Sequence, residues 1–334
     1  MRLSIIIPAY KVEGFIEKCI RSLEAQNIPK IDYEIIVTND GSPDKSSEIV
    51  RKLQAEFSNL ILIDQENQGV SMARNNAIAM AKGKYILPID PDDYVLPNTF
   101  HRFLERAEQE DLDGFYLGFE VFDVNGKSTW HTNYNHLQQT VDGVEGYFAS
   151  RGPGVVDPDR SVGMLFKKSI LDQFEIHYPK DVPYLEDGLF LAKFFAVAQK
   201  VAFDNQRFYQ RTTRPGSATN SALFYSEKAI QGFIHAIEDI KSFGNKIESR
   251  QSQKLLINHV VGKFTLLPLT SFIGQKNIKN YFKFIQKLKE KHLNKITTEG
   301  LRLDYAKMAS IYNSSALLFY IYYPISCKLK NYKK

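Results

Sequence analysis

The sequence predicts an α/β fold with a mostly parallel sheet flanked by helices, followed by an α-helical C-terminal extension. Three observations support this fold class. Apolar runs typical of buried strands alternate with helical patterns over the first hundred residues, and strands joined through helices pair in parallel. From about residue 225 the apolar patterns have the helical period. The chain has 334 residues, 43% of them hydrophobic, which is enough for two domains.

Strands and helices alternate in the N-terminal third. Strands are expected at residues 3–8, 33–38, 60–63 and 85–89. These runs are apolar throughout, as in a parallel sheet that is covered on both faces. Helices are expected at residues 14–26, 44–57 and 70–82. The first helix has an apolar stripe that comprises Phe15, Ile16, Cys19, Ile20 and Leu23.

The pattern changes after residue 100. Helices are expected at residues 98–109 and 186–198, and strands at 114–121, 162–166, 201–203 and 208–210. Residues 124–142 show no clear periodicity, and the Gly, Pro and Asp content of residues 151–160 predicts a loop. In the C-terminal part, helices are expected at residues 225–243, 248–267, 275–293 and 298–323.

Composition excludes several classes of protein. With only two cysteines, the chain has neither a disulfide framework nor a four-cysteine zinc site. The apolar run before Pro8 is too short for a signal peptide or a membrane span, so a cytosolic protein is expected. The net charge of +5 is unevenly distributed: residues 1–224 hold 24 basic and 31 acidic side chains, and residues 225–334 hold 19 and 7. Two parts with different partners are therefore expected.

Acidic side chains gather where the fourth predicted strand ends. Asp90-Pro91-Asp92-Asp93 places three carboxylates within four residues, and open parallel sheets bind ligands at the carboxyl ends of their strands. Like charges this close repel one another strongly unless a cation neutralises them. Oxygen-only ligands suit Mg²⁺ or Mn²⁺, ions that commonly bridge to phosphates. From these four residues alone, a solvated turn explains the pattern equally well.

Four motifs in a fixed order extend this interpretation: IIIPAY, VTNDGSPDKS, NQGVSMARN and DPDD. Together they resemble glycosyltransferase family 2, the inverting enzymes of the GT-A fold, over about residues 1–220. The resemblance implies a GT-A catalytic domain at residues 1–224, with a nucleotide-binding half at 1–100 and an acceptor-binding half at 101–224. Residues 225–334 do not match the family core and are expected to form a basic, amphipathic α-helical extension.

The resemblance implies a set of donor-binding residues. The segment that matches Pro8-Ala9-Tyr10 lines the nucleotide base in the family. The residue that matches Asp40 contacts the base or the ribose, and a carboxylate can accept hydrogen bonds from either. The segment that matches residues 69–75 closes over the nucleotide, with Gly69 at its start and Arg74 as its cation.

The resemblance also implies the metal ligands. Asp90 and Asp92 match the DxD signature that holds the metal on the diphosphate, and Asp92 matches the direct ligand. Asp93 matches an additional acid that is often present, for which a direct role and an ordinary loop position are both open. The family usually has Asn after the tyrosine, whereas this chain has Lys11. Exposure of Lys11 to solvent is favoured over contact with a phosphate.

Inverting transfer needs a base for the acceptor hydroxyl and positive charge for the leaving diphosphate. Glu186-Asp187, at a predicted helix start, resembles the family's ED motif, which makes Asp187 the base and Glu186 its support or an acceptor ligand. Acids that stabilise a helix N-terminus would look the same. Residues 209–217, YQRTTRPGS, resemble a stretch that follows the ED motif in many members. Arg214 and then Arg211 are the candidates to neutralise the diphosphate; a basic loop is the alternative.

The C-terminal part carries a basic helix and an apolar run. One face of the predicted helix 275–293 carries Lys276, Lys279, Lys283, Lys287 and Lys291. Residues 315–324, SALLFYIYYP, are apolar and aromatic but too short to span a bilayer. Basic amphipathic helices and interfacial tyrosines favour an anionic membrane surface. A peripheral position on the inner face of the cytoplasmic membrane is therefore expected, with an ordinary helical subdomain as the alternative.

The expected function is transfer of a sugar from a nucleotide-sugar, a UDP-sugar in the first instance, to a saccharide acceptor. Mn²⁺ or Mg²⁺ is the expected cofactor, the acceptor is expected to be lipid-linked, and the product would be a bacterial surface polysaccharide such as capsule. No recognition motif supports a nucleic-acid partner. Two alternatives stay open: a nucleotide-sugar nucleotidyltransferase, and a non-catalytic, membrane-associated assembly protein that keeps the fold.

Overall fold

The computed structural model describes residues 1–150, 158, 160–212, 222–247 and 250–331. The chain packs as two compact units. The first comprises Met1–Lys180 with Val197–Ala218, and the second comprises Asp181–Ala196 with Thr219–Lys334. The domain boundary predicted between residues 224 and 225 stays a prediction.

A mixed sheet forms the centre of the first unit. Its strands lie in the order β3-β2-β1-β4-β8-β6-β9-β5, and β7 pairs with β6. The parallel part comprises β1 (Leu3–Ala9), β2 (Tyr33–Asp40), β3 (Leu60–Gln65) and β4 (Tyr85–Pro88). The remainder comprises β5 (Tyr94–Val95), β6 (Gly114–Phe122), β7 (Ser128–His131), β8 (Met164–Lys167) and β9 (Val201–Thr212). Strand β8 runs antiparallel to both of its neighbours, whereas β6 and β9 are parallel.

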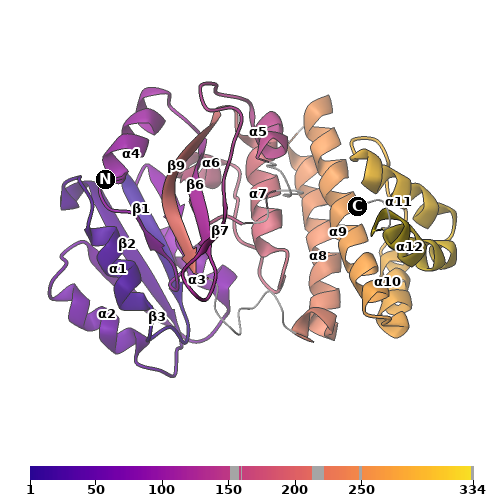
Figure 1. Cartoon of the computed structure of the whole chain (residues 1–334), viewed down its shortest axis with the longest axis horizontal. Helices are drawn as coiled ribbons and strands as arrows, with labels where there is room; N and C mark the ends of the chain where they lie inside the picture. Colours follow the sequence, from indigo (N-terminus) through magenta and orange to yellow (C-terminus); the bar gives the residue numbers. More distant parts are fainter. Residues whose placement is uncertain (151–157, 159, 213–221, 248–249, 332–334) are drawn as a thin grey trace. The chain divides into compact units, whose positions relative to one another are not determined.

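Helices connect and cover the parallel strands. They are α1 (Ile16–Glu24), α2 (Ser46–Gln54), α3 (Val70–Met80) and α4 (Phe100–Gln109), with a 3-10 turn at Lys30–Asp32. Helices α1 and α2 lie side by side against these strands (Figure 1). The apolar stripe predicted for α1 is buried at Ile16, Cys19, Ile20 and Leu23. Strand β1 is buried along its whole length, as a strand covered on both faces must be. The predicted fold class is confirmed.

Several elements differ from the sequence prediction. Separate strands were expected at residues 201–203 and 208–210, but β9 runs through the polar stretch between them, and β6 pairs with it on both sides of residues 204–206. The pairing shifts register at Gly118, where a Cβ would lie 2.1 Å from the carbonyl oxygen of Gln206. Strand β7 and the helices α5 (Gly143–Ala149) and α6 (Lys168–Gln173) were not predicted, because short elements leave little periodic signal.

The second unit is helical. It contains α7 (Glu186–Val197, except its last residue), α8 (Glu227–Lys246), α9 (Gln251–Gly274), α10 (Ile278–Glu290), α11 (Leu303–Ser314) and α12 (Ala316–Asn331), with a 3-10 turn at Ala222–Tyr225. Helices α8 and α9 lie side by side (Figure 1). The single helix predicted at residues 298–323 is wrong: extended backbone at Ser315 separates α11 from α12.

Helix α9 is the core helix of this unit. Among the described residues it is the one helix long and apolar enough to cross a membrane, and 67% of its apolar 18-residue stretch is buried. Gly262 lets Leu301 approach, since an added Cβ would lie 2.5 Å from the leucine side chain. A buried core helix meets the same length and composition criteria as a membrane span, so these criteria alone do not make α9 a span.

Candidate active site

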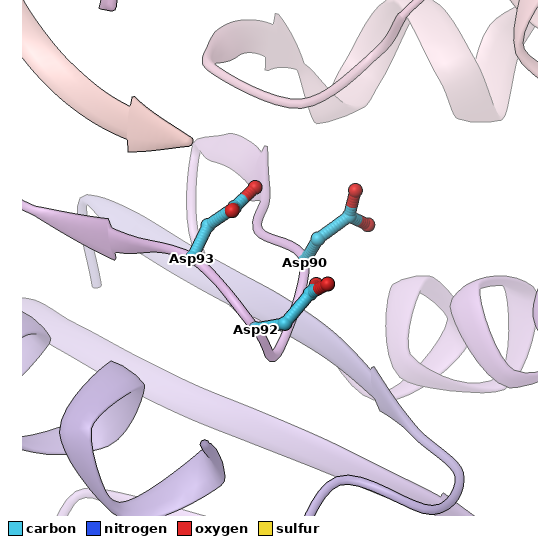
Figure 2. Close-up of side chains that lie close together, drawn as sticks. All are labelled: Asp90, Asp92 and Asp93. Atoms are coloured by element: carbon cyan, nitrogen blue, oxygen red, sulfur yellow. The ribbon is translucent and has the colours of Figure 1, made fainter. Parts of the chain in front are cut away.

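Three carboxylates lie on the turn after β4. The ligand oxygens of Asp90, Asp92 and Asp93 lie within 4.8 Å of one another, and the three side chains point to the same side of the turn (Figure 2). Asp90 and Asp92 are half-buried and Asp93 is buried. A compact set of carboxylate oxygens fits a hard divalent cation such as Mg²⁺ or Mn²⁺. The turn therefore has the donor chemistry expected of a metal site.

Asp93 is fixed to the end of β9. Its Oδ2 accepts a hydrogen bond from the Tyr209 hydroxyl at 2.7 Å, and its Oδ1 accepts one from the Thr212 N–H at 3.0 Å. The Thr212 hydroxyl also donates to the Asp92 carbonyl at 2.8 Å. Burial, together with the charge of Asp90, raises the pKa of the Asp93 carboxyl to about 7. These contacts hold the acidic turn against the end of β9, and the direct and the ordinary loop role of Asp93 both stay predictions.

Arg74, the predicted cationic side chain of the donor site, lies beside the acidic turn. The Arg74 guanidinium donates to Asp90 Oδ1 at 3.0 Å, although the arginine is only 4% exposed. It also lies over the ring of Tyr178, 5.0 Å from the centroid. The Asn75 side chain holds the Tyr178 backbone by donating to its carbonyl and accepting from its N–H. The structure thus brings a buried positive charge to the acidic cluster, as electrostatic neutralisation of these carboxylates requires.

Asp40 organises the segment that leads into α3. Its Oδ1 accepts hydrogen bonds from Gln65 Nε2 at 2.8 Å and from the Gln68 N–H at 2.7 Å, and its Oδ2 accepts from the Gly69 N–H at 2.9 Å. Gly69 has a φ of 88°, which suits glycine, and directly precedes α3. A carboxylate has about four acceptor positions, and three are already used. The geometry therefore supports a positioning role for Asp40 alongside the base or ribose contact that the resemblance implies.

The loops after β1 and β2 are tied together. Pro8 and Ala9 are buried in β1, whereas Tyr10 is 43% exposed just beyond it. Lys11 is exposed and has a φ of 54°, and its N–H donates to the Ser42 hydroxyl at 2.7 Å. The Lys11 ammonium lies 5.3 Å from the centroid of the Tyr10 ring. This position agrees with the expectation that Lys11 faces solvent.

Asp44 is the centre of this loop junction. It accepts hydrogen bonds from the hydroxyls of Ser42 and Ser46, each at 2.6 Å, and from the Glu13 N–H at 3.0 Å. Burial acts to raise the pKa of Asp44, but the hydrogen bonds from both serines outweigh it and lower that pKa to about 2. The ionised carboxylate therefore holds the two loops together.

The predicted catalytic acids begin α7. Glu186 and Asp187 form its first turn, both are half-buried, and both belong to the second unit. Tyr184, just before them, has a φ of 71°, an uncommon conformation for an aromatic residue that is often associated with functional sites. Arg211 is exposed near the end of β9, and Arg214 lies outside the described residues.

Sequence reasoning missed two residues of the acidic turn's support, Tyr209 and Thr212. Both lie in the YQRTTRPGS stretch, in which the charge of the arginines indicates a site function and the neutral side chains give no such signal. The buried Tyr209 and the half-buried Thr212 act as hydrogen-bond donors beside the three carboxylates. The pairing of β5 with β9, which brings them there, has no signal in the local sequence.

The sheet and the acidic turn at the end of β4 together define an enzyme of the GT-A class. The family model described as glycosyl transferase family 2 matches residues 4–172. The chain therefore belongs to glycosyl transferase family 2, and the predicted family and enzyme class are confirmed.

Relatives agree with this assignment, and a solved structure has a similar fold. A poly(ribitol-phosphate) beta-glucosyltransferase of Bacillus spizizenii is 30% identical over 258 residues, which are 76% of this chain and 38% of that protein. The uncharacterized glycosyltransferase EpsJ of Bacillus subtilis is 32% identical over 65% of this chain and 62% of its own length. The chain thus spans less than two thirds of either relative. The crystal structure of S. aureus TarS 1-349 in complex with UDP-GlcNAc has a TM-score of 0.61 and 20% identity, covering 87% of this chain and 92% of that one.

Proposed function

We propose that the protein is an inverting glycosyltransferase that moves a sugar from a UDP-sugar to a saccharide acceptor in the synthesis of a bacterial surface polysaccharide. The acidic turn with its buried arginine carries this proposal, because it combines metal-ligand chemistry with a nearby cation. Two relatives support the substrate class by their names: one is a poly(ribitol-phosphate) beta-glucosyltransferase, and S. aureus TarS is a poly(ribitol-phosphate) beta-N-acetylglucosaminyltransferase. TarS has also been solved with UDP-GlcNAc.

Contacts within the first unit support the proposed donor site. Asp92 and Asp90 would hold Mn²⁺ or Mg²⁺, which would supply positive charge to the donor diphosphate. Arg74 keeps Asp90 oriented through its 3.0 Å hydrogen bond. Pro8, Ala9 and the exposed ring of Tyr10 line the base side, and Asp40 holds Gly69, the first residue of the segment 69–75 that closes over the nucleotide.

Asp187 is the proposed base. It takes the proton of the acceptor hydroxyl as the oxygen attacks the anomeric carbon and the diphosphate leaves from the opposite face, so the configuration inverts. Glu186 supports it or binds the acceptor. Arg214 and Arg211 are the proposed cations for the departing diphosphate. The strained backbone at Tyr184 supports a functional role for the turn that follows it.

The acceptor is proposed to be lipid-linked, which gives the basic C-terminal helices a reason to lie on the inner face of the cytoplasmic membrane. Residues 225–334 hold 19 basic and 7 acidic side chains, and each basic residue near an anionic surface contributes about 1 kcal/mol of attraction. A nucleotidyltransferase would instead have a glycine-rich loop after the first strand, where this chain has Tyr10-Lys11.

Thermal unfolding with UDP, GDP, CMP and ADP, each with and without Mn²⁺, tests the proposal. Ligand at 100 times its Kd adds about 2.7 kcal/mol to the unfolding free energy, which is a shift of a few degrees for a chain of this size. We expect a shift with UDP only when Mn²⁺ is present. A shift with another nucleotide would replace the donor class. The absence of any shift would count against the proposed transfer and favour a non-catalytic assembly protein.

A further inference from the structure

Helix α12 exposes a row of large apolar side chains. Leu317, Leu318, Ile321 and Ile325 are 57%, 52%, 55% and 53% exposed, and we refer to these four residues as the α12 stripe. At 3.6 residues per turn they fall within an arc of about 100°. Isolated exposed leucines are ordinary on protein surfaces, whereas a continuous apolar row marks an interaction site.

The opposite face of α12 is firmly packed on its own unit. Phe319 is fully buried and its ring lies 6.1 Å from that of Tyr312 on α11. The Tyr281 hydroxyl of α10 donates to the Ala316 carbonyl at 2.6 Å, and the rings of Tyr281 and Tyr320 are 5.0 Å apart. The helix is therefore held in place while it presents the stripe to the surroundings.

The charge of this part of the chain is one-sided. Residues 305–334 contain five lysines and no acidic residue. On α10 the situation differs, because Lys283 and Lys287 pair with Glu227 of α8 and Lys291 pairs with Glu238 at 3.1 Å. Much of the lysine face expected to meet a membrane is thus neutralised within the unit, whereas residues 305–334 hold no acidic residue of their own to balance their lysines.

We propose that the α12 stripe inserts into an anionic lipid surface at the boundary of headgroups and acyl chains. An apolar stripe on a packed helix, flanked by the half-buried Tyr320 and Tyr322 and accompanied by unbalanced lysines, has the composition of an interfacial helix. A second copy of the chain would bring the same positive charge to the stripe, and this repulsion favours lipid over self-association. The inference refines the membrane contact of the proposed function by assigning it to α12 instead of α10.

Flotation of the full chain with vesicles tests this assignment. The vesicles contain phosphatidylcholine alone, or phosphatidylcholine with a third of the lipid as phosphatidylglycerol, and no acceptor or nucleotide. We expect flotation with the anionic vesicles, and a partition coefficient at least about tenfold lower for the double variant Leu318→Glu/Ile321→Glu, since burial of one such side chain is worth about that much. The control is Leu303→Glu, which adds one of these two negative charges at a leucine that is 92% exposed at the start of α11, and it should float like the wild type.

Three outcomes would overturn the assignment. These are failure of the wild type to float, unchanged flotation of the double variant, and a wild-type dimer in light scattering that the double variant converts to monomer. Far-UV circular dichroism and the melting temperature show whether the double variant is folded. If it is not, Ile325→Gln alone gives the same comparison, with a smaller expected loss. Because the vesicles lack donor and acceptor, flotation is independent of the UDP and Mn²⁺ measurement, so the two proposals fail separately.

Discussion

The hydroxyl of Tyr209 donates a hydrogen bond to Asp93 across 2.7 Å, which joins the end of β9 to the acidic turn after β4. The same hydroxyl accepts from the Asp90 N–H at 3.0 Å, and the tyrosine ring stacks on Phe119 at 4.6 Å. Tyr209 is fully buried. One rigid side chain therefore fixes two positions of the turn that carries the proposed metal ligands.

Replacement of Tyr209 by Phe should weaken the turn without emptying the core. We expect the unfolding free energy to fall by about 1–3 kcal/mol, because buried Asp93 loses a hydrogen-bond donor. The Mn²⁺ concentration needed for half-maximal UDP binding should rise several-fold, because the carboxylates are no longer held in register. Tyr85→Phe is the control, since it also removes a buried hydrogen bond, to the Ala107 carbonyl. Tyr85→Phe should lower the unfolding free energy without changing the Mn²⁺ dependence of UDP binding. Unchanged Mn²⁺ dependence in Tyr209→Phe would remove the positioning role.

Asp92→Asn should have opposite effects in the two states of the site. Without metal, we expect a higher melting temperature than in the wild type, because one of three clustered like charges is gone. With Mn²⁺, the UDP-induced shift in melting temperature should disappear, because the proposed direct ligand is lost. Glu48→Gln, which removes one exposed charge outside the acidic cluster, should not raise the melting temperature and should leave the UDP-induced shift unchanged. A full UDP shift with Mn²⁺ in Asp92→Asn would place the metal elsewhere.

The first four strands could be predicted because their signal is local. An apolar run between turn residues identifies β1 through β4 without knowledge of their partners. Continuity of β9 through residues 204–207 could not be predicted in this way, because those positions are mostly polar and lie where the pairing with β6 shifts register. The break at Ser315 did have a local signal, because residues 313–315 are polar and the Ser315 hydroxyl accepts from the Leu318 N–H at 3.2 Å.

The residues of the candidate site likewise divide into those with a local sequence signal and those that only the fold brings together. Asp90, Asp92 and Asp93 could be grouped from sequence because they are neighbours in the chain. Arg74 was found through the motif that the family resemblance supplies. The contact of Tyr209 with Asp93 joins residues 116 positions apart, and only the observed strand order reveals it. The three hydrogen bonds that occupy Asp40 likewise depend on the fold of residues 65–69.

Asp44 should contribute stability that depends on pH. Its pKa in the folded state, about 2, is below the value of about 4 expected in the unfolded chain. The folded state therefore favours the ionised form, and the stabilisation is present above about pH 4 and is lost as the pH falls toward 2. We expect Asp44→Asn to lower the unfolding free energy by about 1–2 kcal/mol at pH 7, with the difference from the wild type shrinking toward zero at pH 2. Urea unfolding at a series of pH values measures this, and a constant difference would contradict the assignment.

Asp187→Asn tests the proposed base. The substitution keeps the size of the side chain and removes its ability to take a proton, so turnover should fall by roughly 10²–10⁴. Binding of UDP with Mn²⁺ should be nearly unchanged, because the donor site is assigned to other residues. Glu186→Gln should reduce turnover less, as expected for a supporting group. Steady-state rates with the identified UDP-sugar measure both variants, and wild-type turnover in Asp187→Asn would exclude it as the base.

Lys11→Asn should stabilise the protein. Lys11 has a φ of 54°, a left-handed conformation that is unfavourable for most residues and that Asn tolerates better. Asn is also the residue that the family usually has after the tyrosine. We expect the unfolding free energy to rise by about 0.5–1 kcal/mol. In Lys52→Asn, an exposed control on α2, stability should fall slightly because Asn is a poorer helix former than Lys. The affinity for UDP with Mn²⁺ tests whether Lys11 contacts a phosphate. It should be unchanged in Lys11→Asn, because the exposed ammonium lies by the Tyr10 ring. A several-fold loss of affinity would instead show that Lys11 reaches a phosphate.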